Sequence, residues 1–208
     1  APMKAARPPP TAGAPGSVRI IGGRWRGTRL PVPHKAGLRP TSDRVRETLF
    51  NWLQPVLPGA RVLDLFAGSG ALGLEAASRG AATVQLVEAD PQLAQGLRDT
   101  VGRLRADDVV RVHAGDALAW LRGAGEPFDI AFVDPPFHAA LWPQVLQLLP
   151  ARMAADAWLY LESPAGQVPA LPGDWALHRE NATREVRYAL YRRVTLGPMN
   201  DSGEPATT

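Results

Sequence analysis

Val62-Leu-Asp-Leu-Phe-Ala-Gly-Ser-Gly-Ala-Leu-Gly73 joins an apolar run to a glycine-rich turn and the start of a predicted helix. Its glycines Gly68, Gly70 and Gly73 match the G-x-G-x-x-G pattern of dinucleotide-binding units. A nicotinamide site usually runs an apolar strand directly into the first glycine, because the pyrophosphate needs N–H donors and no nearby anion. Here the strand end contains Asp64 instead. A carboxylate at this point favours a ligand with a cationic end, such as an α-amino group and a sulfonium.

Most of the chain after residue 60 alternates between apolar segments and segments with helical periodicity. Strands are predicted at residues 61–66, 83–89, 109–114, 128–133 and 157–162, and helices at residues 71–79, 91–104, 117–122 and 139–149. This alternation is typical of a parallel sheet with both faces covered by helices. Residues 175–179 and 185–194 follow without an intervening helix, which predicts a closing antiparallel hairpin. The predicted fold class is α/β, with a Rossmann-like, doubly wound, mostly parallel sheet of seven strands.

A shorter unit precedes the alternating part. Residues 17–21 and 28–32 flank Gly22-Gly-Arg-Trp-Arg-Gly27, which predicts a β-hairpin with a basic, aromatic tip. Thr41-Ser-Asp43 provides N-cap side chains for a helix that runs to about Leu53. We therefore expect a disordered tail, a basic hairpin and helix, a ligand-binding domain and a second disordered tail, at residues 1–16, 17–55, 56–196 and 197–208.

Positive charge is concentrated near the beginning of the sequence. The net charge of the chain is +3, yet residues 1–48 contain ten basic residues against only Asp43 and Glu47. The basic residues are Lys4, Arg7, Arg19, Arg24, Arg26, Arg29, Lys35, Arg39, Arg44 and Arg46. This segregation predicts an arm that binds a polyanion, joined to a nearly neutral body.

Composition argues against several other classes of protein. Apolar residues make up 45% and charged residues 21% of the chain, which is ordinary for a soluble globular protein. No apolar stretch has membrane-spanning length and no hydrophobic signal region is visible, so we expect no membrane partner and a cytoplasmic location. The absence of cysteine excludes thiolate metal sites. No metal site is predicted, because the histidines share no ligand spacing: His34, His113, His138 and His178.

Acidic residues occur at the ends of four consecutive predicted strands, at Asp64, Glu88, Asp116 and Asp134. Parallel strands bring these ends to one edge of the sheet, where α/β proteins bind ligands. Glu88 is placed to accept from two ribose hydroxyls, and Asp116 to accept from an adenine amino group. Each has a structural alternative: a surface carboxylate for Glu88, a helix N-cap for Asp116 and a buried hydrogen-bonded group for Asp64. Four such residues in order favour the ligand site.

The turn Asp134-Pro-Pro-Phe137 follows the apolar run that ends at Val133. Both prolines have a fixed φ and no N–H, so the turn is stiff and its carbonyls are free to accept. A flat base with an amino group could stack on Phe137 and donate its N–H protons to Asp134 and the Pro135 carbonyl. The alternative is a rigid turn with a capping Asp.

These segments, taken in order, resemble the S-adenosylmethionine-dependent methyltransferases of the Rossmann-like class. The shared features are the glycine-rich segment, the acidic end of the second strand, Gly115-Asp-Ala117 and the Asp134–Phe137 turn. Residues 19–27, 38–50 and 62–73 are further similar to the bacterial family that methylates the N2 amine of a guanine in small-subunit (16S) ribosomal RNA. The resemblance covers nearly all of the chain between the two predicted tails.

The resemblance implies that S-adenosylmethionine is the cofactor. The implied cofactor-binding residues are Asp64, Phe66, Gly68, Gly70, Glu88, Asp116 and Ala117. It also implies that Asp134, Pro135 and Phe137 are catalytic and orient the target amine. The implied partner is ribosomal RNA or an assembling small ribosomal subunit, and we expect the chain to act as a monomer.

The arginines of the basic unit are the predicted RNA contacts, because guanidinium groups suit phosphates and an aromatic ring suits a stacked base. The predicted substrate-binding residues are Arg24, Trp25, Arg26, Arg39 and Arg44. Arg46 lies near the same predicted helix start and could also line the entrance of the site.

Three other functions stay open at this point. An adenine-N6 methyltransferase acting on DNA or RNA also uses an Asp-Pro-Pro-aromatic turn, although this chain has no evident domain for reading duplex sequence. A protein amino-group methyltransferase would not need the basic arm. A non-catalytic RNA-binding protein would not need Asp64, Glu88 and Asp134 all to be intact.

Overall fold

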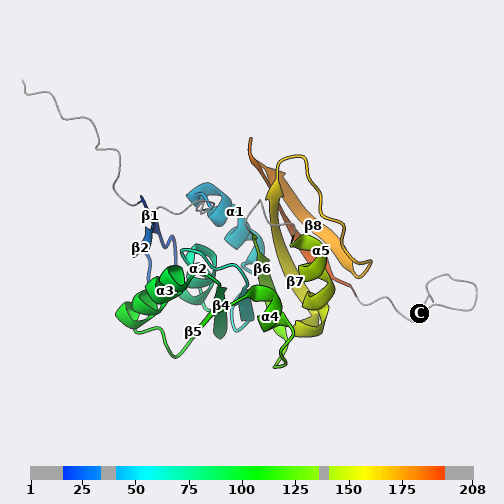
Figure 1. Ribbon diagram of the computed structural model, residues 1–208. Coiled ribbons are helices and arrows are strands. Elements are labelled where there is room, and N and C mark those ends of the chain that lie inside the picture. Colours follow the sequence, from blue (N-terminus) through cyan, green and yellow to red (C-terminus); the bar gives the residue numbers. More distant parts are fainter. Residues whose placement is uncertain (1–15, 34–40, 136–140, 195–208) are drawn as a thin grey trace, which may run out of the picture.

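The central element of the structure is a seven-stranded sheet, seen in a computed structural model that describes residues 16–33, 41–135 and 141–194 (Figure 1). The strand order is β5-β4-β3-β6-β7-β9-β8. The strands are β3 (Arg61–Asp64), β4 (Thr83–Glu88), β5 (Val110–Ala114), β6 (Phe128–Val133), β7 (Met153–Pro164), β8 (Trp175–Ala182) and β9 (Val186–Arg193). The first five in this order are parallel, whereas β9 pairs antiparallel with both β7 and β8. The predicted α/β fold with a closing hairpin is confirmed.

Helices cover both faces of the sheet (Figure 1). They are α1 (Asp43–Leu53), α2 (Ala71–Ser78), α3 (Pro91–Leu104), α4 (Ala117–Leu121), α5 (Trp142–Leu148) and the 3-10 helix η1 (Leu149–Arg152). Side chains of α1, α2 and α3 pack into one hydrophobic core, and those of α4, α5 and η1 pack into a second core. Successive residues of a strand point into different cores, as Ile130 and Ala131 of β6 do. The strands are apolar on both faces for this reason, which is the pattern of a doubly wound sheet.

The basic unit at the start of the chain is part of the first core. Its hairpin consists of β1 (Gly16–Arg19) and β2 (Arg29–Val32), which pair antiparallel. Ile20 and Leu30 are completely buried and belong to the same core as the helices α1 and α2. The hairpin is therefore packed onto the body of the protein.

Several element boundaries differ from those expected. The strand β7 spans twelve residues, Met153–Pro164, because it continues beyond the predicted 157–162 as the partner of both β6 and β9. The helix α5 begins at Trp142, later than the expected 139. The predicted tails lie almost entirely outside the described residues, except that Gly16 is the first residue of β1. Within the described ranges, the helices are too short and too polar for any of them to cross a bilayer.

The strand order creates a switch point at the carboxyl ends of β3 and β6. The chain runs outward from β3 through β4 to β5, and then returns to β6 on the other side of β3. Asp64 at the end of β3 is level with Phe132 of β6, two residues before Asp134. The turn between β8 and β9 reaches the same edge, because Val186 pairs with Pro164 at the end of β7. Ligands of open α/β sheets bind at such an edge.

Candidate active site at the carboxyl edge of the sheet

The glycine-rich loop between β3 and α2 has the backbone conformation that only glycine adopts freely. Gly68 and Gly70 have φ values of 57° and 80°, in the left-handed region. Gly70 is the N-cap of α2, and an added Cβ there would lie 2.7 Å from Leu97. The loop therefore turns tightly and directs the backbone N–H groups at the start of α2 toward the edge of the sheet.

The Asp64 side chain fixes the glycine-rich loop by a hydrogen bond with the first turn of α2. Its carboxylate Oδ2 accepts a hydrogen bond of 2.9 Å from the Gly73 N–H, and the side chain is buried. Burial raises the pKa of Asp64 from an ordinary value near 3.8 to about 7, the Gly73 hydrogen bond opposes the rise, and the charge of Glu88 adds to it. A cationic group brought to this edge would lower the pKa of Asp64 again. The buried hydrogen-bonded group considered from the sequence is therefore observed, and it lies beneath the ligand edge.

The two other predicted cofactor carboxylates end the neighbouring strands. Glu88 is half-buried, and its two oxygens accept from the N–H groups of Gly68 at 2.8 Å and Asp90 at 2.9 Å. Asp116 is exposed and caps α4, because its Oδ2 accepts from the Ala119 N–H at 2.8 Å. The structural alternative for Asp116 is thus present, although a carboxylate that caps a helix retains lone pairs for a ligand.

Phe66 and Ala117 complete the set of predicted cofactor residues. Phe66 is half-buried and packs against the second hydrophobic core, directly before the glycine-rich loop. Ala117 is buried as the first residue of α4. The structure thus brings all of the predicted cofactor residues to one edge of the sheet, at the ends of β3, β4 and β5.

The half-buried Asp134 follows β6 at the same edge, next to the buried Pro135. Its carboxyl group forms a hydrogen bond with Glu162 of β7, the neighbouring strand. Burial and the contact with Glu162 raise the pKa of Asp134 well above its usual range, and Asp64 adds to the effect. Phe137, the third predicted catalytic residue, lies outside the described residues.

Glu162 itself was not singled out from the sequence. It is buried, and its Oε2 accepts from the Tyr160 hydroxyl at 3.0 Å and from the Thr41 hydroxyl at 3.3 Å. Burial raises the pKa of Glu162, while the hydrogen bonds from Tyr160, Asp134 and Thr41 lower it. A single glutamate late in an apolar strand was the only available signal, and two of its partners, Thr41 and Asp134, lie far away in the sequence.

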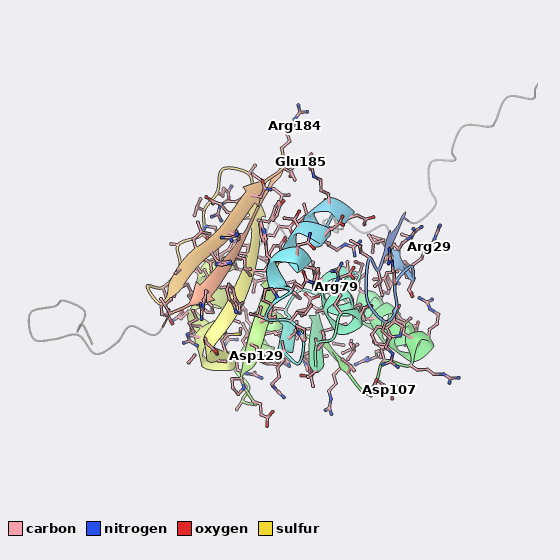
Figure 2. The ribbon with its side chains drawn as sticks, turned by 180° about the vertical axis from the view of Figure 1, so that it is seen from behind. Arg29, Arg79, Asp107, Asp129, Arg184 and Glu185 are labelled. Atoms are coloured by element: carbon pink, nitrogen blue, oxygen red, sulfur yellow. The ribbon has the colours of Figure 1, made fainter. Side chains whose placement is uncertain are left out.

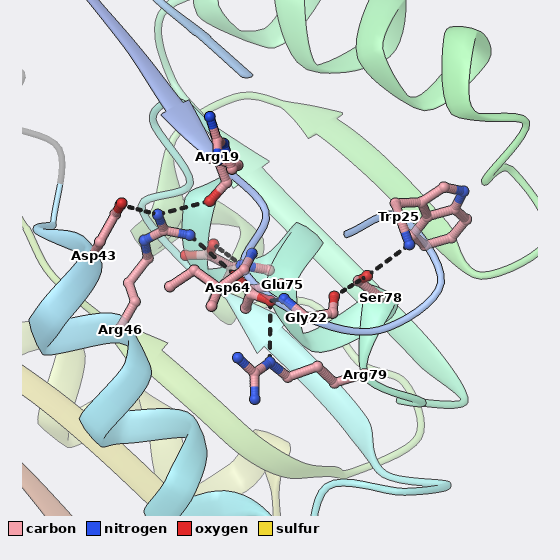
Figure 3. A network of polar contacts seen from close by, with 11 residues as sticks. Arg19, Gly22, Trp25, Asp43, Arg46, Asp64, Glu75, Ser78 and Arg79 are labelled. Atoms are coloured by element: carbon pink, nitrogen blue, oxygen red, sulfur yellow. Dashed lines mark hydrogen bonds and ion pairs between the residues drawn. The ribbon is translucent and has the colours of Figure 1, made fainter. Parts of the chain in front are cut away.

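The loop that carries Arg24, Trp25 and Arg26 is attached to α2 by main-chain hydrogen bonds (Figure 3). The Arg24 N–H donates to the Ser78 carbonyl at 2.8 Å, and the Trp25 N–H donates to the Ser78 hydroxyl at 2.9 Å. Ser78 in turn donates to the Gly22 carbonyl at 2.6 Å. These contacts leave the side chains of Arg24 and Arg26 exposed, whereas Trp25 is half-buried and packs against the first core.

Glu75 provides the second attachment of this loop. Its buried carboxylate accepts from the N–H groups of Ile21 at 2.8 Å and Gly22 at 3.0 Å. Arg46 and Arg79 donate to the same carboxylate at 3.1 Å and 3.0 Å (Figure 3). Neither Glu75 nor Ser78 was identified from the sequence, because helix α2 reads simply as an apolar helix.

Arg46 does not line the entrance of the site, contrary to our expectation. Its side chain is completely buried, and besides Glu75 it contacts Asp43 and the Arg19 carbonyl. Arg44 is exposed in the first turn of α1, close to the edge that holds Glu162. Arg39 lies outside the described residues.

The predicted RNA-binding arginines are therefore spread over the surface. The loop with Arg24 and Arg26 is attached near the end of α2, whereas the strand-end carboxylates lie at its start, about 12 Å away for an eight-residue helix. The turn with Arg184 and Glu185 lies at the carboxyl edge, opposite the edge of Asp107 and Asp129 (Figure 2). Arg184 is a basic residue near the site that the sequence did not single out.

Strand order, glycine-rich loop and strand-end carboxylates together define a Rossmann-like methyltransferase. The model of the protein family described as Conserved hypothetical protein 95 matches residues 18–192, and the chain belongs to this family. The resemblance seen in the sequence motifs is thereby confirmed.

Individual relatives agree with this assignment. A ribosomal RNA small subunit methyltransferase D from Escherichia coli is 48% identical over 191 residues, which is 90% of this chain and 96% of the relative. The protein of that name from Haemophilus influenzae is 42% identical over 88% of this chain and 97% of the relative. Among solved structures, a putative methyltransferase from Escherichia coli has a TM-score of 0.78 and 49% identity, covering 86% of this chain and 99% of that one.

Proposed function

We propose that the chain transfers a methyl group from S-adenosylmethionine to the exocyclic N2 amine of a guanine in small-subunit ribosomal RNA. The observation that carries this proposal is the carboxyl group of Asp134, which follows β6 beside the glycine-rich loop of β3. The family assignment supports the reaction, and the names of the relatives support ribosomal RNA of the small subunit as the substrate.

The residues at the carboxyl edge fit S-adenosylmethionine. Glu88 is placed for the two ribose hydroxyls, and Asp116 with Ala117 for the adenine. Asp64, whose pKa is raised by burial, suits a ligand with a cationic end better than one with a pyrophosphate. When bound, the cofactor supplies an electrophilic methyl group on its sulfonium.

Asp134 and Pro135 orient the amine. The lone pair of a guanine N2 is delocalised into the ring, which makes the nitrogen a poor nucleophile. Hydrogen bonds from the amino protons to the Asp134 carboxyl and the Pro135 carbonyl hold the nitrogen pyramidal and direct its lone pair at the methyl group. Phe137 stacks on the base once it has been turned out of its helix or loop. Positioning and fixed dipoles account for most of the acceleration, and no covalent enzyme intermediate is needed.

Exposed arginines on two sides of the site bind the RNA backbone. Arg44 and Arg184 lie near the carboxyl edge and contact phosphates close to the target base. Arg24 and Arg26 contact phosphates farther along the RNA, and Trp25 offers part of its ring to a base. Arg39 belongs to the same set of predicted contacts. The chain acts as a monomer on RNA or on an assembling small subunit.

The test uses the full chain with labelled cofactor, small ribosomal subunits lacking the modification, and duplex DNA. We expect label only in ribosomal RNA, with mass mapping of the nucleosides showing a methylated guanine N2. Asp134→Asn should lower the rate by about 100-fold or more, because an amide cannot take the proton that the methylated nitrogen loses, while cofactor affinity stays within a few-fold. The matched control is Asp107→Asn, at the opposite edge of the sheet (Figure 2). Label in DNA or in adenine, or full activity of Asp134→Asn, would refute the proposal.

A further inference from the structure

Among the described residues, Glu162 is the only buried acidic residue of β7. It lies next to Asp134 and Pro135, the turn that is proposed to bind the amine. The register places it there, because Val133 of β6 pairs with Leu161 of β7, so that the next residues, Asp134 and Glu162, are level on adjacent strands. Glu162 has 7% of its surface exposed. A buried carboxylate next to a second carboxyl group is costly unless a proton or donors compensate the charge.

Three donors surround Glu162. The hydroxyl groups of Tyr160 and Thr41 donate to its Oε2 at 3.0 Å and 3.3 Å. The third hydrogen bond joins it to the Asp134 carboxyl group. Two carboxyl groups can form such a bond only when one of them carries a proton. Because Glu162 has two hydroxyl donors of its own, its charged form is the better stabilised, and the proton resides on Asp134.

This arrangement leaves Asp134 with two different oxygens. One carries the proton and donates it to Glu162, and the other is free to accept an N–H from the amine. The hydrogen bond to Glu162 therefore fixes which oxygen of Asp134 faces the substrate. It also provides an exit for a proton, because Glu162 can take the Asp134 proton when another one arrives.

We propose that Glu162 is a positioning residue of the methyl transfer, which orients the Asp134 carboxyl group and receives its proton; this inference rests on the proposed function. The bond between the nitrogen and the methyl carbon forms while the bond between that carbon and sulfur breaks, and the electron pair stays on sulfur. The nitrogen then carries a positive charge and loses one proton to the free oxygen of Asp134. The proton already on Asp134 passes to Glu162, so that charge and atoms balance.

The groups that interact with this pair, or with its partner Tyr160, lie on three strands and in the segment before α1. Asp64 lies at the end of β3, Tyr160 lies on β7 beside Glu162, and Tyr188 of β9 interacts with Tyr160. Thr41 lies directly before Ser42, the N-cap of α1. If Asp134 and Glu162 both carry a proton, neither can take the proton released by the methylated nitrogen. The rate of methyl transfer should therefore decline on the acidic side of its pH profile.

The test measures single-turnover methyl transfer to small ribosomal subunits from about pH 5 to pH 9 with the full chain. Glu162→Gln should lower the rate by roughly 10- to 100-fold, because the amide cannot take the proton. The acidic limb of the pH–rate profile of this variant should move to lower pH, because Asp134 loses the neighbouring negative charge that raises its pKa. The affinity for S-adenosylhomocysteine should stay within a few-fold, and Glu47→Gln on the exposed face of α1 is the matched control.

Tyr160→Phe provides a second, independent measurement that also decides the matter if Glu162→Gln does not fold. Loss of the hydroxyl donor destabilises the charged form of Glu162, so the acidic limb should move to higher pH. An unchanged rate and an unchanged profile in Glu162→Gln, or an unmoved limb in Tyr160→Phe, would overturn the inference. If the unmodified chain transfers no methyl group to ribosomal RNA, the proposed function fails as well. If the chain is active, Asp134→Asn inactive and Glu162→Gln normal, then only the role of Glu162 fails.

Discussion

Arg46 of α1 and Glu75 of α2 form an ion pair of 3.1 Å in which both side chains are completely inaccessible to solvent. The pair also connects to the basic loop, because the same Glu75 carboxylate accepts from the Ile21 and Gly22 N–H groups. One buried carboxylate therefore joins the helix before the sheet, the helix after the glycine-rich loop and the hairpin. Removal of either charge leaves the other one buried with weaker compensation, because Glu75 keeps only Arg79 and Arg46 keeps only Asp43 as an ionic partner.

Arg46→Met should destabilise the protein by about 3 kcal/mol, the lower end for a broken buried ion pair, since Glu75 would keep only the partly exposed Arg79 as its counter-ion. The measurement is urea unfolding followed by tryptophan fluorescence and by circular dichroism. Arg44→Met, two residues away on the exposed face of the same helix, is the control and should change the stability by no more than about 0.5 kcal/mol. Equal stabilities of the two variants would contradict the assigned role of the pair.

Gly23→Ala should loosen the basic loop far more than Gly27→Ala. Both glycines have a left-handed φ, 80° and 84°, so both substitutions strain the backbone to a similar extent. A Cβ at Gly23 would lie 1.9 Å from the Ser78 carbonyl oxygen, whereas nothing lies within 4 Å of one at Gly27. We expect a cost of about 1 kcal/mol for Gly27→Ala and roughly 1–3 kcal/mol more for Gly23→Ala.

Hydrogen exchange of the Arg24 and Trp25 amides gives a local measurement for the same pair of variants. Exchange should accelerate in Gly23→Ala, because these amides lose their acceptors on Ser78. The same protection in both variants would show that the loop is held by other contacts.

Asp64→Asn should make the stability less dependent on pH. The folded-state pKa of Asp64 is raised to about 7, so the folded protein binds this proton more tightly than the unfolded chain does. The stabilisation is therefore fully present below about pH 4 and is lost as the pH rises through about 7, at about 1.4 kcal/mol per pH unit between these limits. Asparagine can still accept from the Gly73 N–H.

The free energy of unfolding at several pH values between about 5 and 8 tests this expectation. Asp64→Asn should show a smaller fall in stability over this range than the unmodified chain. The pKa of Asp134 is raised as well, so Asp134 also contributes stability that is lost with rising pH. Some dependence of the unfolding free energy on pH therefore remains in the variant. An identical slope in both proteins would mean that Asp64 ionises normally.

Replacement of both Arg24 and Arg26 by Gln should weaken RNA binding without altering the transfer step. If each contacts one phosphate, the slope of log affinity against log salt concentration should decrease by about one per arginine. Arg122→Gln is the control, because Arg122 is exposed at the end of α4, away from the carboxyl edge. A fall in affinity with an unchanged salt slope would point to lost loop structure instead of lost phosphate contacts.

The sequence predicted the parts of this protein that follow from local patterns. Alternating apolar strands and helices identified the doubly wound sheet, and the absence of a helix before residues 185–194 identified its antiparallel end. Asp116 was visible as a possible helix cap, because an N-cap contacts residues two or three positions away. The glycines that follow an apolar strand likewise predicted the loop before α2, in which Gly68 and Gly70 have left-handed φ values.

Contacts between distant segments were not predictable in the same way. Glu75 binds Ile21 across 54 positions and Glu162 binds Thr41 across 121 positions, and no local pattern records such pairs. Arg46 was expected at the site entrance, because a basic residue early in a helix usually faces solvent, yet its charge is compensated by Glu75 in the interior. Buried charges are exceptions to composition rules, and each depends on a partner that only the fold brings near.

The packing of Ile20 and Leu30 into the first core affects how such a protein can acquire a new substrate. A basic segment that is only tethered can be exchanged by recombination, because the enzyme beside it folds without it. Here the hairpin contributes apolar side chains to the same interior as Leu49 and Leu74, so its loss would expose the catalytic body to water. If the loop binds RNA as proposed, RNA preference can change by substitutions on its exposed face, but the loop and the enzyme must be inherited together.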